Sequence, residues 1–209
     1  YTETKNKWTP SFFAWLNKLT MSAKLKEVLD EYFEEYRRLS DKIERMDNTI
    51  YEEAHSDRYE ERVKKLICLK GIKEHTALSF LVEVGDFSRF KDAKSFSAYL
   101  GLTPREHSSS DKRRLGSITK DGNSYLRKLL TEAAQTYTKG SIGYKSKVLK
   151  ARQEGNEEKV IKYADKASIR LQKRYYHLTA SNKQSNVAKI AIARELSSFI
   201  WRMMTDNIN

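Results

Sequence analysis

The strongest constraint on the fold is a run of apolar residues early in the chain. From residue 25 to residue 50 they lie alternately four and three residues apart, and almost all the positions between them are charged. This heptad spacing predicts one long helix, with Ser22 suited to cap its start. We expect the apolar seam to pair with a second subunit in a coiled coil; antiparallel packing on the chain's own domain is the alternative. The seam comprises Leu25, Leu29, Tyr32, Tyr36, Leu39, Ile43, Met46 and Ile50.

Aromatic side chains gather just ahead of this helix, in the stretch WTPSFFAWLNKL at residues 8–19. Pro10 after Thr9 fits the first turn of a short amphipathic helix. An aromatic cluster of this kind is more often a docking surface than a ligand site. We therefore expect it to pack on another element or domain.

Glycine and proline are scarce, with 8 and 2 among 209 residues, which favours long uninterrupted helices. The last helical stretch, residues 186–204, is apolar on too many sides for a surface helix, so we place it in the core. The fold class we predict is all-α, with a long coiled-coil arm followed by a compact helical domain. Residues 1–66 would form the aromatic connector and oligomerisation helix, and residues 67–209 the helical domain.

The net charge of +12 is unevenly distributed along the chain. Residues 1–66 carry 13 basic and 14 acidic side chains, whereas residues 67–209 carry 27 and 14. Such a basic excess, interleaved with tyrosine and tryptophan, is typical of proteins that bind a polyanion, most often nucleic acid. Ribosomal, chaperone-like and membrane-surface proteins share the pattern. No stretch approaches the roughly 20 apolar residues of a membrane span, and the lone Cys68 fits a reducing compartment, so we expect a cytoplasmic protein with no membrane partner.

A helix-hairpin-helix-like element is predicted within residues 63–102. One apolar helix ends near Lys70, Gly71 supplies a permissive turn, and a second helix begins near Glu74. Amides at the start of the second helix, with Lys70 and Lys73 beside them, could contact a DNA phosphate. Lys73 replaces the second glycine usual in such hairpins, so a purely structural hairpin is an equal alternative.

Three segments occur together in a characteristic order: GLTP at 101–104, HSSSDKRRLGSITKDGNSYLRKLL at 107–130 and NVAKIAIAREL at 186–196. In this order they resemble the C-terminal transposase domain of the insertion sequence 110 and 1111 family, relatives of the pilin-gene invertase. The aromatic stretch and heptad helix resemble that family's connector and coiled coil. The resemblance covers nearly the whole chain, and makes residues 67–209 a helical transposase domain.

The resemblance implies a catalytic serine in a loop at residues 105–123. Alignment on Ile118, Lys120, Gly122 and Asn123 places that serine at Ser109. The family usually has glycine next, where this chain has Ser110, so Ser108 and Ser110 remain alternatives. The implied enzyme is a DNA transposase or recombinase, in which the serine attacks a phosphodiester, forms a covalent protein–DNA intermediate and exchanges strands.

Partners are implied as well: DNA, a structured non-coding bridge RNA that selects the target, and further copies of the chain in a dimer or tetramer. The cell would be bacterial or archaeal and the protein nucleoid-associated. Cationic and polar side chains would contact the nucleic acid. The candidates are Lys70, Lys73, Arg105, Lys112, Arg113, Arg114, Lys120, Asn123, Arg127, Lys145 and Lys147, joined by Lys150 and Arg152.

Full-length members of the family also carry an N-terminal RuvC-like domain with four acidic metal-binding residues. Residues 1–66 show a coiled-coil pattern where strands would be required. We therefore expect this chain to bind no metal or other cofactor itself, a divalent metal such as Mg to be held by that separate domain, and the chain alone to be inactive. His75 and His177, with one cysteine, make no zinc spacing.

Two alternatives stay open. The serine-rich segment could be a polar loop that caps the following helix, and the whole chain a non-catalytic nucleic-acid-binding and oligomerisation module. Tyrosine nucleophiles are a further possibility, but the arginine and histidine pattern of tyrosine recombinases is not evident, and packing or base stacking is the favoured role for all of them. These are Tyr137, Tyr144, Tyr163, Tyr175 and Tyr176.

Overall fold

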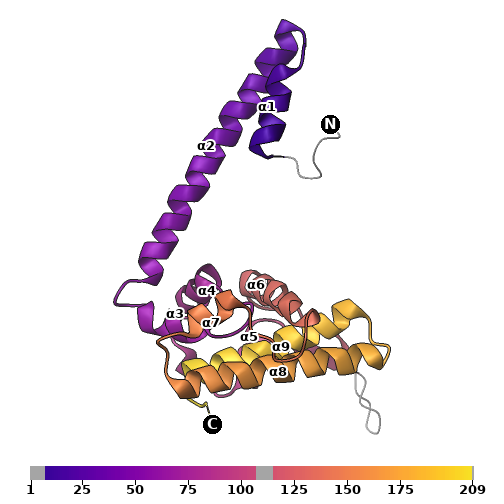
Figure 1. Ribbon diagram of the computed structural model, residues 1–209. Helices are drawn as coiled ribbons and strands as arrows, with labels where there is room; N and C mark the ends of the chain where they lie inside the picture. The colour runs from indigo at the N-terminus through magenta and orange to yellow at the C-terminus, as the bar shows by residue number, and fades with distance from the viewer. Residues whose placement is uncertain (1–7, 107–114, 209) are drawn as a thin grey trace. The chain divides into compact units, whose positions relative to one another are not determined.

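The computed structural model describes residues 8–106 and 115–208. The chain divides after Asn48 into two compact units, which are treated separately below (Figure 1). None of the helices in the described ranges is long and apolar enough to cross a membrane.

The first unit contains α1 (Pro10–Lys18) and most of α2 (Ala23–Ala54). The short helix predicted at Pro10 is present, and Thr9 caps it, since its side chain accepts the Phe12 amide at 3.3 Å. Part of the aromatic cluster packs on α2 of the same unit. The Phe13 ring lies 5.4 Å from that of Phe33 and 5.1 Å from that of Tyr36, measured between centroids.

The long helix predicted from the heptads is confirmed as α2, and Ser22 accepts the Leu25 amide at its start. Most of its apolar seam lies on the surface, because α1 covers only the side that carries Phe33 and Tyr36. The exposed fraction is 62% for Leu25 and 60% for Ile43. The exposed apolar stripe of α2 consists of Leu25, Val28, Tyr32, Leu39, Ile43 and Met46.

The second unit is helical apart from one hairpin of two short strands, so the all-α prediction is confirmed. Its helices are α3 (Glu60–Ile67), α4 (Glu74–Val84), α5 (Ala93–Tyr99), α6 (Ser124–Ala134), α7 (Lys147–Gln153), α8 (Glu158–Ala180) and α9 (Ser185–Met204), with 3-10 turns at Phe87–Arg89 and Gln135–Thr138. The strands are β1 (Pro104–Glu106) and β2 (Leu115–Ile118), paired antiparallel. The hairpin was not predicted.

Helix α9 is the centre of this unit, as its sequence predicted. It packs against α3, α5, α6 and α8, and runs beside α8 (yellow and orange in Figure 1). Ile192, Leu196 and Ile200 are fully buried along it. A helix covered on several sides needs apolar residues all around, which explains its pattern.

The boundary between the units falls earlier than the predicted division after residue 66. Ala54, Tyr59, Val63 and Leu66 are buried in the core of the second unit. The prediction followed the charge balance, which locates the basic excess but does not report packing. Residues 49–66 therefore belong to the compact unit.

The turn between α3 and α4 contains Gly71, as predicted, and is held from inside the domain. The Tyr137 hydroxyl donates to the Lys70 carbonyl at 2.5 Å, and the Gln153 amide donates to the Cys68 carbonyl at 3.1 Å. Arg152 donates to the Ile72 carbonyl. These contacts give the turn a structural role. Its contact with a DNA phosphate stays a prediction.

Candidate functional site

The serines of interest lie between the two strands. Residues 107–114, which include Ser108, Ser109, Ser110 and the cations Lys112, Arg113 and Arg114, fall outside the described residues. Pro104 pairs with Ile118, and Glu106 pairs with Leu115. The segment therefore begins and ends at neighbouring positions of an antiparallel hairpin.

The base of this hairpin is fixed by backbone hydrogen bonds between two parts of the chain. The first part is residues 99–104 and the second is residues 119–123. Leu102 is fully buried and anchors the first part in the core. Three amides of the second part donate to carbonyls of the first, and this holds the ends of the hairpin in register. The bonds run from Thr119 to Thr103 at 2.9 Å, from Lys120 to Gly101 at 3.1 Å, and from Asn123 to Tyr99 at 3.0 Å.

Gly122 sits where the two parts approach most closely. Its φ is +149°, and a Cβ placed there would lie 2.2 Å from the Tyr99 carbonyl oxygen and 2.9 Å from the Gly101 nitrogen. No side chain fits in that space, so only glycine allows the motif to close. The Lys-x-Gly-Asn spacing is thus explained by the fold of the hairpin base.

Asn123 and Arg127, predicted as nucleic-acid contacts, are both engaged inside the protein. Asn123 caps α6 by accepting the Leu126 amide at 2.9 Å, and its Nδ2 donates to Glu83 at 2.8 Å. Arg127 donates to the Leu100 carbonyl at 3.0 Å. Their evident role is to hold α6 against the hairpin base.

Arg105 and Lys120 are the predicted cations that the structure brings to this hairpin base. Both are exposed, and Arg105 donates to the Thr119 carbonyl at 3.2 Å across the hairpin. Their side chains therefore flank the described ends of the serine segment.

A second group of predicted cations lies around the α3–α4 turn and α7. Lys145 is committed internally, since its ammonium contacts Asp165 at 2.7 Å and Gln153 at 2.9 Å. Lys70 is half-buried, and burial lowers its pKa. Lys73 and Lys147 are exposed. Arg152 is tied to the Ile72 carbonyl, so among these residues Lys73 and Lys147 have the freest access to a ligand.

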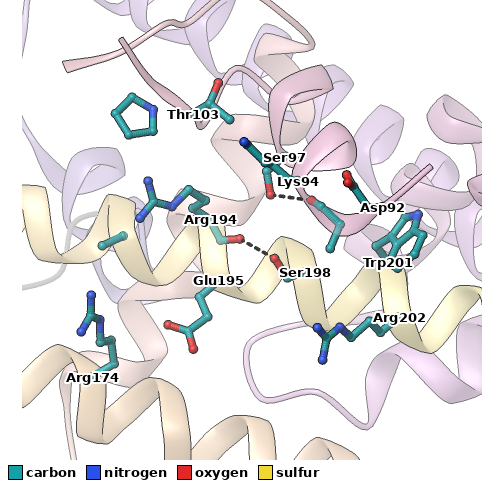
Figure 2. A pocket seen from close by; sticks show the side chains of 13 residues that line it. Asp92, Lys94, Ser97, Thr103, Arg174, Arg194, Glu195, Ser198, Trp201 and Arg202 are labelled. Carbon is teal, nitrogen blue, oxygen red and sulfur yellow. Dashed lines mark hydrogen bonds between the residues drawn. The ribbon is translucent and has the colours of Figure 1, made fainter. Parts of the chain in front are cut away.

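Four basic residues that sequence reasoning missed line a cavity of about 670 Å³ beside the hairpin. Figure 2 shows Arg174 entering from α8, Arg194 and Arg202 from α9, and Lys94 from α5. Thr103 and Pro104, at the start of β1, also line it. The missed signal was the regular spacing of basic residues along α8 and α9.

The comparison with known proteins identifies the domain that contains this hairpin. Residues 63–146 match the family described as Transposase IS116/IS110/IS902 family. The chain carries a transposase domain of this family. The match runs from α3 through α6 to the start of α7, and therefore includes the hairpin and the base that fixes it.

Several transposases are similar to the chain. The y4qE protein of Sinorhizobium fredii, named as a transposase, is 38% identical over 65% of this chain and 34% of its own length. The transposase for insertion sequence element IS1533 of Leptospira borgpetersenii is 31% identical over 87% of this chain and 52% of its own. The pilin gene-inverting protein of Moraxella bovis is 30% identical over 65% of this chain and 44% of its own length. The chain thus spans between about a third and about half of these relatives.

The described part of the chain holds no cluster of metal ligands, and two of its candidate tyrosine nucleophiles are buried. No group of three or more His, Cys, Asp or Glu side chains in that part could hold a metal ion. Tyr137 is completely buried, and burial raises its pKa; burial also raises the pKa of Tyr163 to about 12. Both tyrosines therefore serve packing.

Proposed function

We propose that this chain is the serine-bearing part of a DNA transposase or recombinase of an insertion sequence. The single observation that carries the proposal is that the motif around Ser109 closes into a braced hairpin inside a domain of this transposase family. The names of the relatives, transposases and pilin gene-inverting proteins, support a DNA substrate.

The proposed reaction has two transesterification steps. The Ser109 hydroxyl oxygen attacks a phosphorus atom of the DNA backbone and gives its proton to a base. One phosphorus–oxygen bond of the strand breaks, and the departing sugar oxygen takes up a proton from the protonated base to leave as a hydroxyl. A sugar hydroxyl of a second strand then attacks the same phosphorus and releases the serine. Cations near the phosphate lower the barrier by stabilising the charge that develops on its oxygens. Lys112, Arg113 and Arg114 follow Ser109 within five positions.

The finer parts of this proposal follow from the resemblance. A bridge RNA would select the target by base pairing, while the protein reads backbone shape and charge. The divalent metal of the reaction would be held by the carboxylates of a RuvC-like domain, as in full-length members of the family that the chain resembles. No step above is assigned to the metal.

Oligomerisation through α2 belongs to the same proposal. Strand exchange between two DNA molecules requires more than one subunit, and the exposed apolar stripe of α2 has the spacing of a coiled-coil interface. Burial of each such side chain would contribute roughly 1.5–3 kcal/mol to association.

The test is recombination by the protein expressed from its complete gene, with Ser108, Ser109 and Ser110 each replaced by alanine. We expect Ser109→Ala to abolish strand exchange and to leave DNA binding intact. Ser117→Ala, on β2 of the same hairpin, is the matched control and should recombine normally. Full recombination by Ser109→Ala, with loss in Ser108→Ala or Ser110→Ala, would move the nucleophile to the neighbouring serine.

The alternative function is a non-catalytic nucleic-acid-binding and oligomerisation module. The exposed stripe of α2 and the basic cavity would serve it equally well. Under this alternative, none of the three serine variants changes recombination by the complete assembly. That result would end the catalytic proposal.

A further inference from the structure

Basic residues recur every four positions on α8 and stand eight positions apart on the adjacent helix α9. On α8 the row is Lys166, Arg170 and Arg174, and on α9 it is Arg194 and Arg202, with Ser198 midway between them. Residues four apart lie on one face of a helix, so each row forms a line of side chains. The two helices pack against each other, which brings the rows together.

Three hollows along these rows share lining residues, and together they are here called the α8–α9 groove. One hollow is lined by Lys166, Arg170 and Arg174, and a second by Lys166, Arg170 and Arg202. The cavity beside the hairpin shares Arg174 with the first hollow and Arg202 with the second. The α8–α9 groove therefore runs along both helices and ends at Thr103 and Pro104, where β1 begins.

Three carboxylates line the α8–α9 groove, and two of them are paired with cations. Glu195 pairs with Arg170, Asp165 pairs with Lys145, and Asp92 accepts the amide and hydroxyl of Ser95. The remaining cations have no carboxylate partner within the described residues: Lys94, Lys166, Arg174, Arg194 and Arg202. Gathered cations without counter-charges repel one another and create a positive potential that an anion relieves.

The shape of the groove favours a linear polyanion over a small ion. Successive residues of each row are separated by about 6 Å along the helix axis, which is comparable to the spacing of phosphates along a nucleic-acid strand. Arginine guanidinium groups bind phosphate oxygens through two parallel hydrogen bonds, and the Thr103 hydroxyl adds a further donor. A free phosphate would satisfy only one part of such a row.

We propose that the α8–α9 groove binds the phosphate backbone of the DNA strand on which the serine acts and leads that strand to the base of the β1–β2 hairpin. The choice of DNA as the polyanion rests on the proposed function. The sequence-predicted cations at the hairpin base, Arg105 and Lys120, would continue the path toward residues 107–114.

The test measures binding of a short DNA duplex, and separately of an RNA hairpin, over a series of salt concentrations. The groove variant is Arg174→Ala with Arg194→Ala, and the matched control is Lys26→Ala with Lys42→Ala, two exposed cations of α2. Each lost phosphate contact makes the slope of log Kobs against log salt shallower by about 0.9. We expect the DNA slope of the groove variant to become shallower by about 1.8 and that of the control to stay unchanged.

The double variant Arg174→Lys with Arg194→Lys separates charge from packing. It should retain the slope of the unmodified protein, because lysine keeps the phosphate contacts. An unchanged DNA slope in the alanine variant overturns the proposal, as does a change confined to the RNA hairpin. Ser109→Ala should leave the DNA slope unaffected. If Ser109→Ala abolishes recombination but the groove variant keeps the normal DNA slope, the groove proposal alone is refuted. If the groove variant has a shallower DNA slope but Ser109→Ala still recombines, the proposed function alone is refuted.

Discussion

Replacing Gly122 by alanine should disrupt the hairpin base more than any comparable change at an open glycine. The added Cβ would lie 2.2 Å from the Tyr99 carbonyl oxygen, far inside contact distance, in a backbone conformation with φ +149°. That conformation alone costs a non-glycine residue about 1–3 kcal/mol. Relief of the clash moves the Tyr99 carbonyl away from the Asn123 amide, which breaks a hydrogen bond worth about 1 kcal/mol. We expect a total loss of about 3 kcal/mol in the free energy of unfolding.

The assay is urea unfolding followed by circular dichroism. With a slope of about 2 kcal/mol/M, the loss lowers the midpoint by about 1.5 M. The control is Gly155→Ala: φ is +78° there, but a Cβ would meet nothing within 4 Å, so only the conformational cost of about 1 kcal/mol applies. If Gly122→Ala lowers the midpoint no more than Gly155→Ala does, the close approach at the hairpin base is not a constraint on the fold.

Three further predictions concern the core and the long helix. Tyr137→Phe leaves the buried Lys70 carbonyl without its donor and should cost about 1–3 kcal/mol, seen as a lower Tm, whereas Tyr144→Phe at an exposed site should cost nothing; equal Tm values would contradict this. Burial raises the pKa of Cys68 from 9.0 to about 11. The buried neutral thiol therefore makes its full contribution to the free energy of unfolding below pH 9, and this contribution is lost as pH rises through 11. Accordingly, a thiol reagent at pH 8 should modify Cys68 only after unfolding, and rapid labelling of the native protein would refute its burial. Leu39→Lys with Ile43→Lys should shift the protein to monomers in sedimentation velocity, and an unchanged oligomer would exclude the α2 stripe as the interface.

The helices that the sequence predicted best are those with an unbroken pattern. The heptads predicted α2, and the dense apolar run from Asn186 predicted the central position of α9. Periodicity does not say which neighbour covers an apolar face. The packing of Phe13 on Phe33 and Tyr36 therefore appeared only in the structure, as did the boundary after Asn48.

The candidate site was predictable where short motifs dictate local geometry. The Gly-Leu-x-Pro and Lys-x-Gly-Asn segments were singled out in the sequence and meet at the hairpin base, although the hairpin itself was not predicted. Residue type alone did not reveal which polar side chains bind within the protein. Asn123 caps α6 and Lys145 pairs with Asp165, and their contacts with nucleic acid stay a prediction. Conversely, Arg174 and Arg194 were missed because they lie 20 residues apart and meet only when α8 and α9 pack together.

The most direct measurement of the central claim is the identity of the residue that becomes linked to DNA. The protein expressed from its complete gene is incubated with a nicked substrate whose cleaved strand diffuses away, which traps the covalent intermediate. After nuclease and trypsin digestion, the peptide of residues 106–112 carries all three serines, and fragmentation in the mass spectrometer assigns the bound nucleotide to one of them. The account predicts the nucleotide on Ser109. A nucleotide on a tyrosine, or a trapped intermediate that still forms in Ser109→Ala, would contradict it.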